Sequence, residues 1–215
     1  MLVRLVRAAL GETGLDLVGA ASVAAYDARA PAGRRARELF APARGLLVVG
    51  SAGRGLWARV RAAAGKGEHR VDDYVESALG LADAALAKEG VGFRRLLPTF
   101  AFTPRADFVA LGEIANLGRM GPFGLLIHPE HGPWWALRGA YLVDREVEPT
   151  PAMAHPCAGC AAPCVGGPGR TLSIAEATPE VRTRCVVGPA SRYDDEQIAY
   201  HYGRAVADVR LSGER

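Results

Sequence analysis

Three cysteines in one short segment have the spacing of metal ligands. Cys157, Cys160 and Cys164 follow the pattern C-x2-C-x3-C, and Cys185 is the only other cysteine in the chain. In a reducing compartment, such a group is better explained by metal binding than by disulfide formation. Four thiolates are a donor set that suits an iron–sulfur cluster and a tetrahedral zinc ion equally. The spacing therefore predicts a metal site with Cys185 as the fourth ligand.

The cysteine segment is similar to the C-x2-C-x2-C-x3-C-P run of bacterial ferredoxins. Its three cysteines match the last three of that run, while Ala154 takes the place of the first cysteine and Val165 that of the proline. Three alternatives follow: a single [4Fe–4S] cluster, a structural zinc ion on the same four thiols, or a loop without metal. His155 either substitutes for a ligand or starts a His-Pro turn, and we favour the turn.

A second group of residues has the character of a pocket for a large, flat cofactor. Residues 125–144 place His, Trp and Arg side chains around glycines in a strand-like apolar segment. A broad apolar macrocycle needs glycines where the backbone approaches it, aromatic walls and a few polar anchors. The candidates are Gly118, Gly121, Phe123, Gly124, His128, Gly132, Trp134 and Trp135. The alternative is a glycine-rich turn with two core tryptophans in a hairpin.

The hydrophobic pattern predicts the elements that position these groups. Apolar side chains at helical spacing predict a long helix at 71–88, and a glycine-bounded run predicts a buried strand at 45–50. Further helices are predicted at 1–11, 51–64, 104–114 with Thr103 as N-cap, and 194–208, and further strands at 15–26, 91–102 (an edge strand, from Pro98), 125–128 and 134–143. Residues 149–169 are predicted to be a loop that needs a metal to be ordered. This order of elements predicts an α+β fold with a mixed or antiparallel sheet.

Composition limits the class of protein. The chain has 215 residues, 49% of them hydrophobic and 23% charged, which is ordinary for one globular domain with or without an appendage. A net charge of +3 is too small for a nucleic-acid-binding surface. No apolar run approaches the roughly 18 residues that cross a membrane, and the N-terminus lacks the apolar core of a signal peptide. We therefore expect a cytoplasmic protein that binds neither nucleic acid nor membrane.

The central segment resembles cobalamin-processing proteins. The run A-N-L-G-R-M-G-P-F-G-L-L-I-H-P-E-H-G starts at Ala115, and it is similar to the A-x-L-G-x2-G-x3-L-L-x-H-P-x2-G motif in the cobalamin-binding part of epoxyqueuosine reductases and reductive dehalogenases. The continuation I-H-P-x2-G-x-W-x-A-x-R-G at 127–139 resembles the cblC-type proteins more closely. A further likeness occurs at 192–200 in R-Y-x2-E-Q-x-A-Y. The resemblance covers most of the chain in patches.

The resemblance implies a scaffold, a cofactor and site residues. The scaffold is a flavin-reductase or nitroreductase-like α+β fold with a C-terminal cysteine-rich loop, and cobalamin is bound without its lower base. FMN on the same scaffold is the alternative cofactor. His128 would contact the corrin rim or fix the following Pro turn, with axial ligation of cobalt as a further alternative. The implied cobalamin-binding residues are Gly118, Gly121, Phe123, Gly124, Ile127, His128, Pro129, Gly132, Trp134 and Trp135.

Three arginines are implied as contacts for a thiol co-substrate. In cblC-type proteins the residue that matches Arg138 helps to hold glutathione, whose thiolate attacks an alkyl group on cobalt, so Arg138 is the predicted catalytic residue. On an alternating strand it would point to the same side as Trp134 and Ala136. Arg184 and Arg192 have the spacing of further glutathione or pocket contacts, and guanidinium groups pair well with carboxylates. Surface ion pairs are the alternative for each arginine.

One departure separates the two related families. Epoxyqueuosine reductases carry a catalytic Asp at a fixed distance before the A-x-L-G motif. Counting back from Ala115 reaches Phe102, and the nearest acid, Asp107, lies inside the predicted helix. The predicted function is therefore removal of the upper axial ligand of cobalamin, by reduction or by thiolate attack, with the iron–sulfur cluster as electron source. The alternatives are a cobalamin-dependent reductase of the epoxyqueuosine or dehalogenase type and a cobalamin carrier without catalysis.

We expect three regions in the chain. These are a cobalamin-binding α+β domain at 1–148, a cysteine-rich ferredoxin-like insert at 149–190, and a C-terminal helix at 191–215 that packs on the first domain. The implied partners are cobalamin, glutathione or another thiol, and an electron donor that the sequence does not identify. A homodimer is an open alternative to a monomer.

Overall fold

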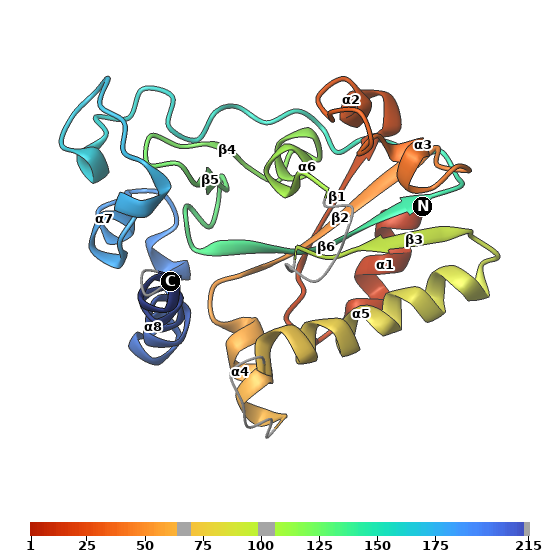
Figure 1. Ribbon diagram of the computed structural model, residues 1–215, viewed down its shortest axis with the longest axis horizontal. Helices are drawn as coiled ribbons and strands as arrows, with labels where there is room; N and C mark the ends of the chain where they lie inside the picture. The colour runs from red at the N-terminus through yellow and green to blue at the C-terminus, as the bar shows by residue number, and fades with distance from the viewer. Residues whose placement is uncertain (64–69, 99–105, 213–215) are drawn as a thin grey trace.

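The computed structural model describes residues 1–63, 70–98 and 106–212, with side chains up to residue 203. Its centre is an antiparallel four-stranded sheet in the order β1–β2–β6–β3 (Figure 1). A small second sheet pairs β4 with β5. The strands are β1 (Leu17–Ser22), β2 (Gly45–Ala52), β3 (Phe93–Leu96), β4 (Arg119–Met120), β5 (Leu126–Ile127) and β6 (Trp135–Val143). The predicted α+β class is confirmed, whereas the likeness to nitroreductases stays a prediction.

Helices cover both faces of the four-stranded sheet and one of its ends. They are α1 (Leu2–Leu10), α2 (Val23–Asp27), α3 (Ala36–Leu39), α4 (Gly55–Ala62), α5 (Arg70–Lys88), α6 (Phe108–Ile114), α7 (Pro179–Thr183) and α8 (Asp195–Ser212), with single 3-10 turns η1 (Pro163–Val165), η2 (Ile174–Glu176) and η3 (Pro189–Ser191). In Figure 1, α1, α4 and α5 lie on one side of the sheet and α2, α3 and α6 on the other, while α7 and α8 lie beyond one end. None of the described helices is long and apolar enough to cross a membrane.

The strand β2 shows why this sheet is covered on both faces. All eight of its residues are buried. Because side chains alternate along a strand, Leu47 and Val49 pack against α1 and α5, whereas Leu46 and Val48 pack against α2, α3 and α6. A strand buried on both faces has a continuous apolar sequence instead of an alternating one. The predicted buried strand at 45–50 is therefore confirmed.

The long helix α5 buries one stripe of its surface, as its sequence predicts. Among the stripe residues, Val71, Leu79 and Leu86 are fully buried and Tyr74 is half-buried against the same core. The helix is also held to the sheet by a hydrogen bond, since the Tyr141 hydroxyl of β6 donates to the Leu79 carbonyl at 3.0 Å. This helix forms one side of the scaffold behind the predicted site.

Two predicted elements start or stop elsewhere because of capping side chains. The predicted strand at 15–26 ends at Ser22, whose hydroxyl accepts a hydrogen bond from the Ala25 backbone and starts α2. The helix predicted at 104–114 begins at Phe108, and Asp107 is its N-cap. The predicted cap, Thr103, lies outside the described residues. The short strand β3 pairs with β6 alone in the described structure, so its predicted edge position is confirmed.

The segment after β6 returns along the α6 side of the molecule and brings the cysteine region to the α7 end (Figure 1). Thr150 holds this segment to the outer edge of β1: its backbone N–H donates to the Ala20 carbonyl, and its hydroxyl accepts from the Ala20 N–H at 2.8 Å. The Asn116 side chain donates to the Thr150 carbonyl at 2.8 Å. The cysteine region then packs on the β4–β5 sheet through its own apolar cluster. The predicted division into three regions stays a prediction.

Candidate functional site

A β-bulge places Arg138. Val49 of β2 lies opposite Gly139 of β6, but the next residue, Gly50, lies opposite Leu137, so Arg138 has no partner across the strand pair. A bulge bends its strand and re-aims a side chain, and bulges are common beside functional sites. The prediction that Arg138 shares a side with Trp134 assumed unbroken alternation. Arg138 nevertheless reaches Ser51, the residue opposite Ala136, and the shared side stays a prediction.

The Arg138 side chain is held without an ion pair. Its Nε donates to the Oγ of buried Ser51 at 2.9 Å. Among the described residues, no carboxylate lies within 4.0 Å of its guanidinium. Burial lowers the pKa of Arg138 from its ordinary value, and the negative charges available on Tyr193 and Asp72 oppose that change. Arginine stays protonated in proteins, so this position offers a positive charge that an anion can neutralise.

The predicted cofactor-binding glycines are used first by the chain's own packing. A Cβ added to Gly118 would lie 2.7 Å from the Trp135 ring, and one added to Gly121 would lie 2.5 Å from Ile127. Gly124 has a φ of 74° and borders the backbone of Ile174. These glycines therefore allow the chain to fold tightly behind the predicted site.

The apolar residues of this segment divide into buried and half-buried ones. Phe123 and Ile127 have no exposed surface, and Trp134 is 1% exposed. Leu126 and Leu137 are half-buried and pack beside the core on the α6 side. The buried residues support the site from within, and the half-buried ones are the apolar side chains that a ligand can touch.

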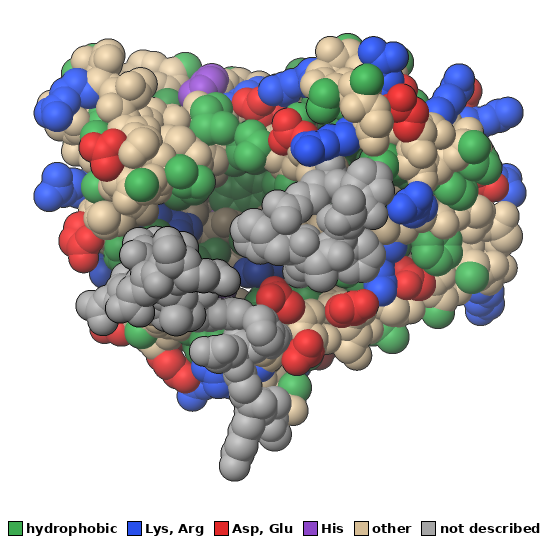
Figure 2. Space-filling view, viewed as in Figure 1, with side chains coloured by type: hydrophobic (Ala, Val, Ile, Leu, Met, Phe, Trp, Pro, Cys, Tyr) green, Lys and Arg blue, Asp and Glu red, His purple; other side chains and the backbone are tan. Residues whose placement is uncertain are grey.

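One face of the molecule is hollowed. Figure 2 shows a hollow between the α6 side and the α7–α8 side, with hydrophobic side chains gathered in it. A separate groove of about 1180 Å³ lies between α1 and residues 145–151, and it is lined by none of the predicted site residues. The hollow is therefore the better candidate for a ligand site.

His128 fixes the turn that follows it. Its Nδ1 accepts hydrogen bonds from the backbone N–H groups of Glu130 at 3.1 Å and His131 at 3.3 Å, across the exposed Pro129. Burial and the neighbouring His131 lower the pKa of His128 to about 4. The ring is therefore neutral near pH 7, with its proton on Nε2 and its Nδ1 engaged. Of the three predicted roles, this geometry favours the turn.

The turn is also tied to the C-terminal part of the chain. The Nδ1 of His131 lies 2.8 Å from the Ser191 hydroxyl in η3. Gly132 has a φ of 58°, and a Cβ on it would collide with the carbonyl of Val187. The turn 128–132 and the segment 187–191 therefore pack with their backbones in contact.

Sequence reasoning missed Arg182, which lies beside two predicted site residues. The Arg182 guanidinium lies over the Trp134 ring at 4.8 Å and the Tyr193 ring at 5.4 Å, and the side chain is buried. The two predicted anion contacts, Arg184 and Arg192, are exposed instead. The structure thus brings Arg182 to Trp134 and Tyr193, and the charge of Arg138 also acts on Tyr193. Nothing in the sequence distinguishes Arg182 from Arg184, because the helix that carries it is five residues long.

The four cysteines gather at the α7 end of the molecule. Cys164 and Cys185 are buried, Cys157 and Cys160 are half-buried, and all four are free thiols. Burial and, to a smaller extent, the other three thiols raise the pKa of Cys157 to about 11. Burial likewise raises the pKa of Cys164 and of Cys185. The thiol of Cys185 thus acts on that of Cys157 across the fold. In the described residues, no group of three or more His, Cys, Asp or Glu side chains has metal-binding geometry.

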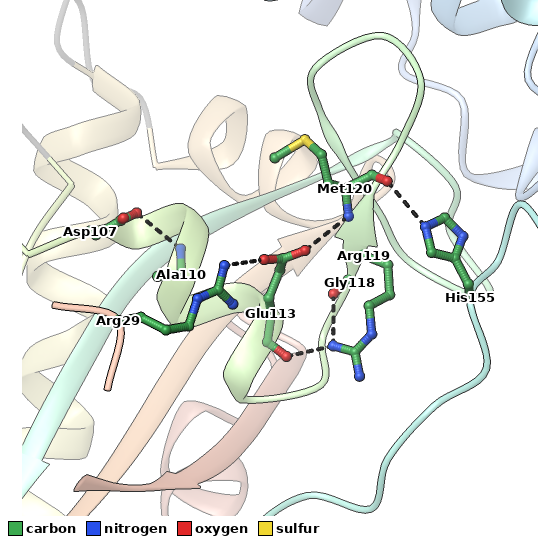
Figure 3. Close-up of polar contacts among 8 residues, drawn as sticks. All are labelled: Arg29, Asp107, Ala110, Glu113, Gly118, Arg119, Met120 and His155. Atoms are coloured by element: carbon green, nitrogen blue, oxygen red, sulfur yellow. Dashed lines mark hydrogen bonds and ion pairs between the residues drawn. The ribbon is translucent and has the colours of Figure 1, made fainter. Parts of the chain in front are cut away.

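His155 connects the cysteine loop to β4. Its Nδ1 accepts a hydrogen bond from the Cys157 N–H at 3.1 Å, so its proton lies on Nε2, which donates to the Met120 carbonyl at 3.2 Å (Figure 3). Both ring nitrogens are thereby engaged. This agrees with the predicted His-Pro turn and not with a metal ligand.

Glu113 of α6 holds the other side of the same strand. Its carboxylate accepts from the Met120 N–H at 3.2 Å and pairs with Arg29 at 2.6 Å, while Arg119 donates to the Glu113 carbonyl at 2.6 Å (Figure 3). The pKa of Glu113 is lowered: burial raises it, but these hydrogen bonds and the charge of Arg29 outweigh the burial. Helix α6, β4 and the cysteine loop thus form one connected support for residues 118–124.

Asp107 is occupied as a helix cap. Its carboxylate accepts a hydrogen bond from the Ala110 backbone N–H at 2.9 Å (Figure 3). The sequence predicted Asp107 to lie inside the helix, and this is wrong, because Asp107 lies just before α6 as its N-cap. A carboxylate engaged in this way has a structural explanation, and Phe102, the position reached by counting back, lies outside the described residues.

Comparison with known proteins gives structural relatives. No family model matches the chain, and no curated protein matches it in sequence. The crystal structure of a B12-trafficking protein CblC from C. elegans, a human MMACHC homologue, superposes with a TM-score of 0.57 and 15% identity, over 92% of this chain and 88% of that one. An epoxyqueuosine reductase from Bacillus subtilis, whose catalytic Asp loop is swung out of the active site, gives a TM-score of 0.52 and 15% identity, over 88% of this chain and 54% of that one.

A third relative is an epoxyqueuosine reductase bound to an epoxyqueuosine-modified tRNA stem loop, with a TM-score of 0.54, 15% identity, and coverage of 76% of this chain and 49% of that one. This chain thus spans about half the length of the reductases. The absence of nucleic-acid binding stays a prediction for this chain. The predicted resemblance is confirmed at the level of the fold: the chain has the fold of the B12-trafficking protein CblC, which it shares with about half of an epoxyqueuosine reductase.

Proposed function

We propose that the chain binds cobalamin in the hollow beside β6 and removes the upper axial ligand of that substrate. The observation that carries the proposal is Arg138, a guanidinium without an ion pair in the described residues, held by Ser51 at the bulge of β6. A positive charge with which no carboxylate of the described residues forms an ion pair, next to an apolar hollow, suits a ligand that is mostly apolar and arrives with an anionic co-substrate. The shared fold with CblC supports cobalamin as the ligand.

The half-buried side chains supply the apolar contacts of this proposal. Leu126 and Leu137 would lie against the corrin, with Phe123 and Ile127 packed behind them. The Nε2 proton of His128 would donate to an amide or carbonyl at the corrin rim, because its Nδ1 is engaged in the turn. His128 would then not coordinate cobalt, and cobalt without a lower donor would be easier to reduce.

Arg138 would bind and orient the thiol co-substrate. A bidentate guanidinium–carboxylate pair fixes both the position and the direction of a peptide thiol such as glutathione. In the thiolate reaction, sulfur forms a bond with the alkyl carbon, the carbon–cobalt bond breaks, and its electron pair stays with cobalt. A cyano form would instead lose its ligand on reduction by an external donor. In both cases Arg138 contributes by positioning and by charge.

We infer that Cys157, Cys160, Cys164 and Cys185 together hold one metal group. Soft thiolates suit an iron–sulfur cluster or zinc, and His155 and the buried setting leave the four sulfurs as the donors. When bound, a [4Fe–4S] cluster supplies one electron at a time, whereas zinc supplies only structure. A bound cation would also offset the raised pKa of Cys157 by stabilising its thiolate.

A test of the catalytic proposal compares dealkylation of methylcobalamin in the presence of glutathione. We expect turnover by the unchanged protein, and a rise of at least tenfold in the glutathione KM in Arg138→Met, since the pairing charge is lost. Arg4→Met is the matched control, because Arg4 of α1 is exposed and is not among the implied thiol contacts. Binding of cobalamin without any turnover would favour the carrier alternative. Reduction that needs no thiol and does not depend on Arg138 would favour the reductase alternative.

A further inference from the structure

Arg182 is a buried cation enclosed by aromatic rings. Its guanidinium carbon lies 4.8 Å from the Trp134 ring centre, 5.4 Å from that of Tyr193 and 5.7 Å from that of Tyr202. The side chain is 8% exposed. A guanidinium over the electron-rich faces of several rings is attracted to each of them. The cage therefore replaces part of the hydration that the charge loses on burial.

The hydrogen bonds of Arg182 join three parts of the chain. One guanidinium nitrogen donates to the carbonyl of Pro133 in the turn before β6, and the other donates to the Tyr202 hydroxyl of α8 at 2.7 Å. The Tyr202 hydroxyl in turn donates to the Ala177 carbonyl at 3.2 Å. Because Arg182 itself belongs to α7, this one side chain fixes α7 and α8 against the turn that carries Trp134.

Within the described part of the chain, no acid forms an ion pair with Arg182. Among residues 1–63, 70–98 and 106–203, no carboxylate forms an ion pair with it, and its Nε has no hydrogen-bond partner. A buried charge is normally paired, since an unpaired one is costly to desolvate. Holding helices together does not by itself explain a buried arginine without an ion pair, because an apolar side chain of the same size could hold them equally well.

Tyr193 links Arg182 to Arg138. Burial raises the pKa of Tyr193, and the positive charges of Arg138 and Arg182 both oppose that rise. The two guanidinium groups thus act on the same buried phenol, one from β6 and one from α7. The Tyr193 ring also packs edge-on against Trp134, with 5.4 Å between the ring centres. Trp134, Tyr193 and Arg182 form a single cluster, and the charge of Arg138 also acts on its phenol.

We propose that Arg182 is a positioning residue that holds Trp134 and Tyr193 as the buried backing of one wall of the ligand site and, with Arg138, gives that wall positive charge with which no carboxylate of the described residues forms an ion pair. This inference rests on the proposed function, because it takes cobalamin as the redox-active ligand of the site. Positive charge near a redox group stabilises the more electron-rich state by Coulomb attraction. The wall would therefore make bound cobalamin easier to reduce, in addition to keeping the site in shape.

The test uses three variants of the full chain: Arg182→Met, Arg182→Lys and, as the matched control, Arg184→Met. Arg184 lies two residues away and is exposed, so its charge is screened by water. The midpoint potential of the cob(II)alamin/cob(I)alamin couple is measured on each protein by spectroelectrochemistry, together with the cobalamin affinity. We expect a more negative potential in Arg182→Met and an unchanged one in Arg184→Met.

Arg182→Lys separates charge from positioning. Lysine keeps the positive charge but not the planar stacking on Trp134 and Tyr193, so we expect a potential close to that of the unchanged protein together with a loss of cobalamin affinity of several-fold. An unchanged potential in Arg182→Met, or an equal shift in Arg184→Met, would overturn the charge part. Full cobalamin affinity in Arg182→Lys would overturn the positioning part, even if Arg182→Met does not fold.

A measurement without cobalamin keeps this inference distinct from the proposed function. The near-UV circular dichroism of the ligand-free protein reports how firmly tryptophan and tyrosine rings are held. We expect Arg182→Lys to weaken this signal while the far-UV spectrum stays the same, and Arg184→Met to leave both unchanged. If cobalamin fails to bind the unchanged protein, the proposed function and the charge part fail together. An unaltered near-UV signal in Arg182→Lys contradicts the positioning part alone.

Discussion

Arg138 and Ser51 are joined by a 2.9 Å hydrogen bond at the point where β2 and β6 lose their register. The bulge supplies the direction of the arginine side chain, and the serine hydroxyl supplies an acceptor that carries no charge. A carboxylate at position 51 would hold the arginine equally well but would neutralise it. The pairing therefore leaves the charge of Arg138 free to act on a ligand.

Replacing Ser51 with alanine tests this relationship. The Nε of Arg138 would lose its acceptor, and we expect the free energy of unfolding to fall by about 1 kcal/mol. In the dealkylation assay, the glutathione KM should rise because Arg138 is no longer held in place. Ser77→Ala on the exposed face of α5 is the control, with no expected effect on either quantity. A Ser51→Ala protein with unchanged thiol kinetics would contradict the positioning role of Ser51.

The glycines at 118 and 121 are predicted to be intolerant of alanine. An added Cβ would lie 2.7 Å from the Trp135 ring at Gly118 and 2.5 Å from Ile127 at Gly121, so we expect each substitution to destabilise the fold by about 1–3 kcal/mol. Gly80 of α5 has open space around its Cβ position. Gly80→Ala should therefore stabilise by about 0.5–1 kcal/mol. Urea denaturation of the three variants measures these changes in the free energy of unfolding. Equal changes in all three would show that close packing does not explain why glycine stands at 118 and 121.

His128 should make stability depend on pH below neutrality. Its pKa is about 4 in the folded chain and 6.5 when unperturbed, so between these values the unfolded chain binds a proton that the folded chain does not. The free energy of unfolding is therefore highest above pH 6.5 and falls as the pH drops towards 4, by at most about 3 kcal/mol from this residue.

The matched variant is His128→Asn, whose side-chain oxygen can accept the same backbone N–H groups without titrating in this range. We expect denaturation curves of His128→Asn at pH 7, 5.5 and 4.5 to lose the part of the pH dependence that His128 contributes. If the two proteins lose stability in parallel on acidification, the buried, neutral state assigned to His128 is wrong.

Cys185 should contribute to metal binding as much as the cysteines of the short segment. We expect protein purified without oxygen to contain iron or zinc, and Cys185→Ser to lower the bound metal to the same extent as Cys157→Ser, because each removes one of four thiolates. Elemental analysis measures the content, and visible absorbance separates iron–sulfur from zinc. Full metal content in Cys185→Ser would exclude Cys185 as the fourth ligand.

The elements that could be predicted are those whose sequence signal is local. Helix α5 follows from its apolar stripe, and β2 from a glycine-bounded apolar run that is buried on both faces. The role of Arg138 was implied by a resemblance, but its direction depends on a bulge that exists only when β6 pairs with β2. A pattern within one strand contains no information about such a break in register.

Arg182 and Arg184 also show that local sequence does not determine which side chain is buried. Arg182 is buried in an aromatic cage and Arg184 is exposed, although both belong to one short stretch of similar composition. What separates them is the position of Trp134, Tyr193 and Tyr202, which come from other parts of the chain. Likewise, Gly118 and Gly121 were predicted from their type, but their packing partners were visible only in the folded chain.

The most direct test of the central claim is an anaerobic titration of the purified protein with cob(II)alamin, followed by visible and electron paramagnetic resonance spectroscopy. We predict saturable binding that converts the substrate to its base-off form, with neither imidazole nor another nitrogen on the lower face of cobalt, because the Nδ1 of His128 is engaged in its turn. A spectrum that stays identical to that of free cob(II)alamin at all protein concentrations would contradict the account. Binding of FMN by the same protein would then identify a flavin as the ligand of this fold.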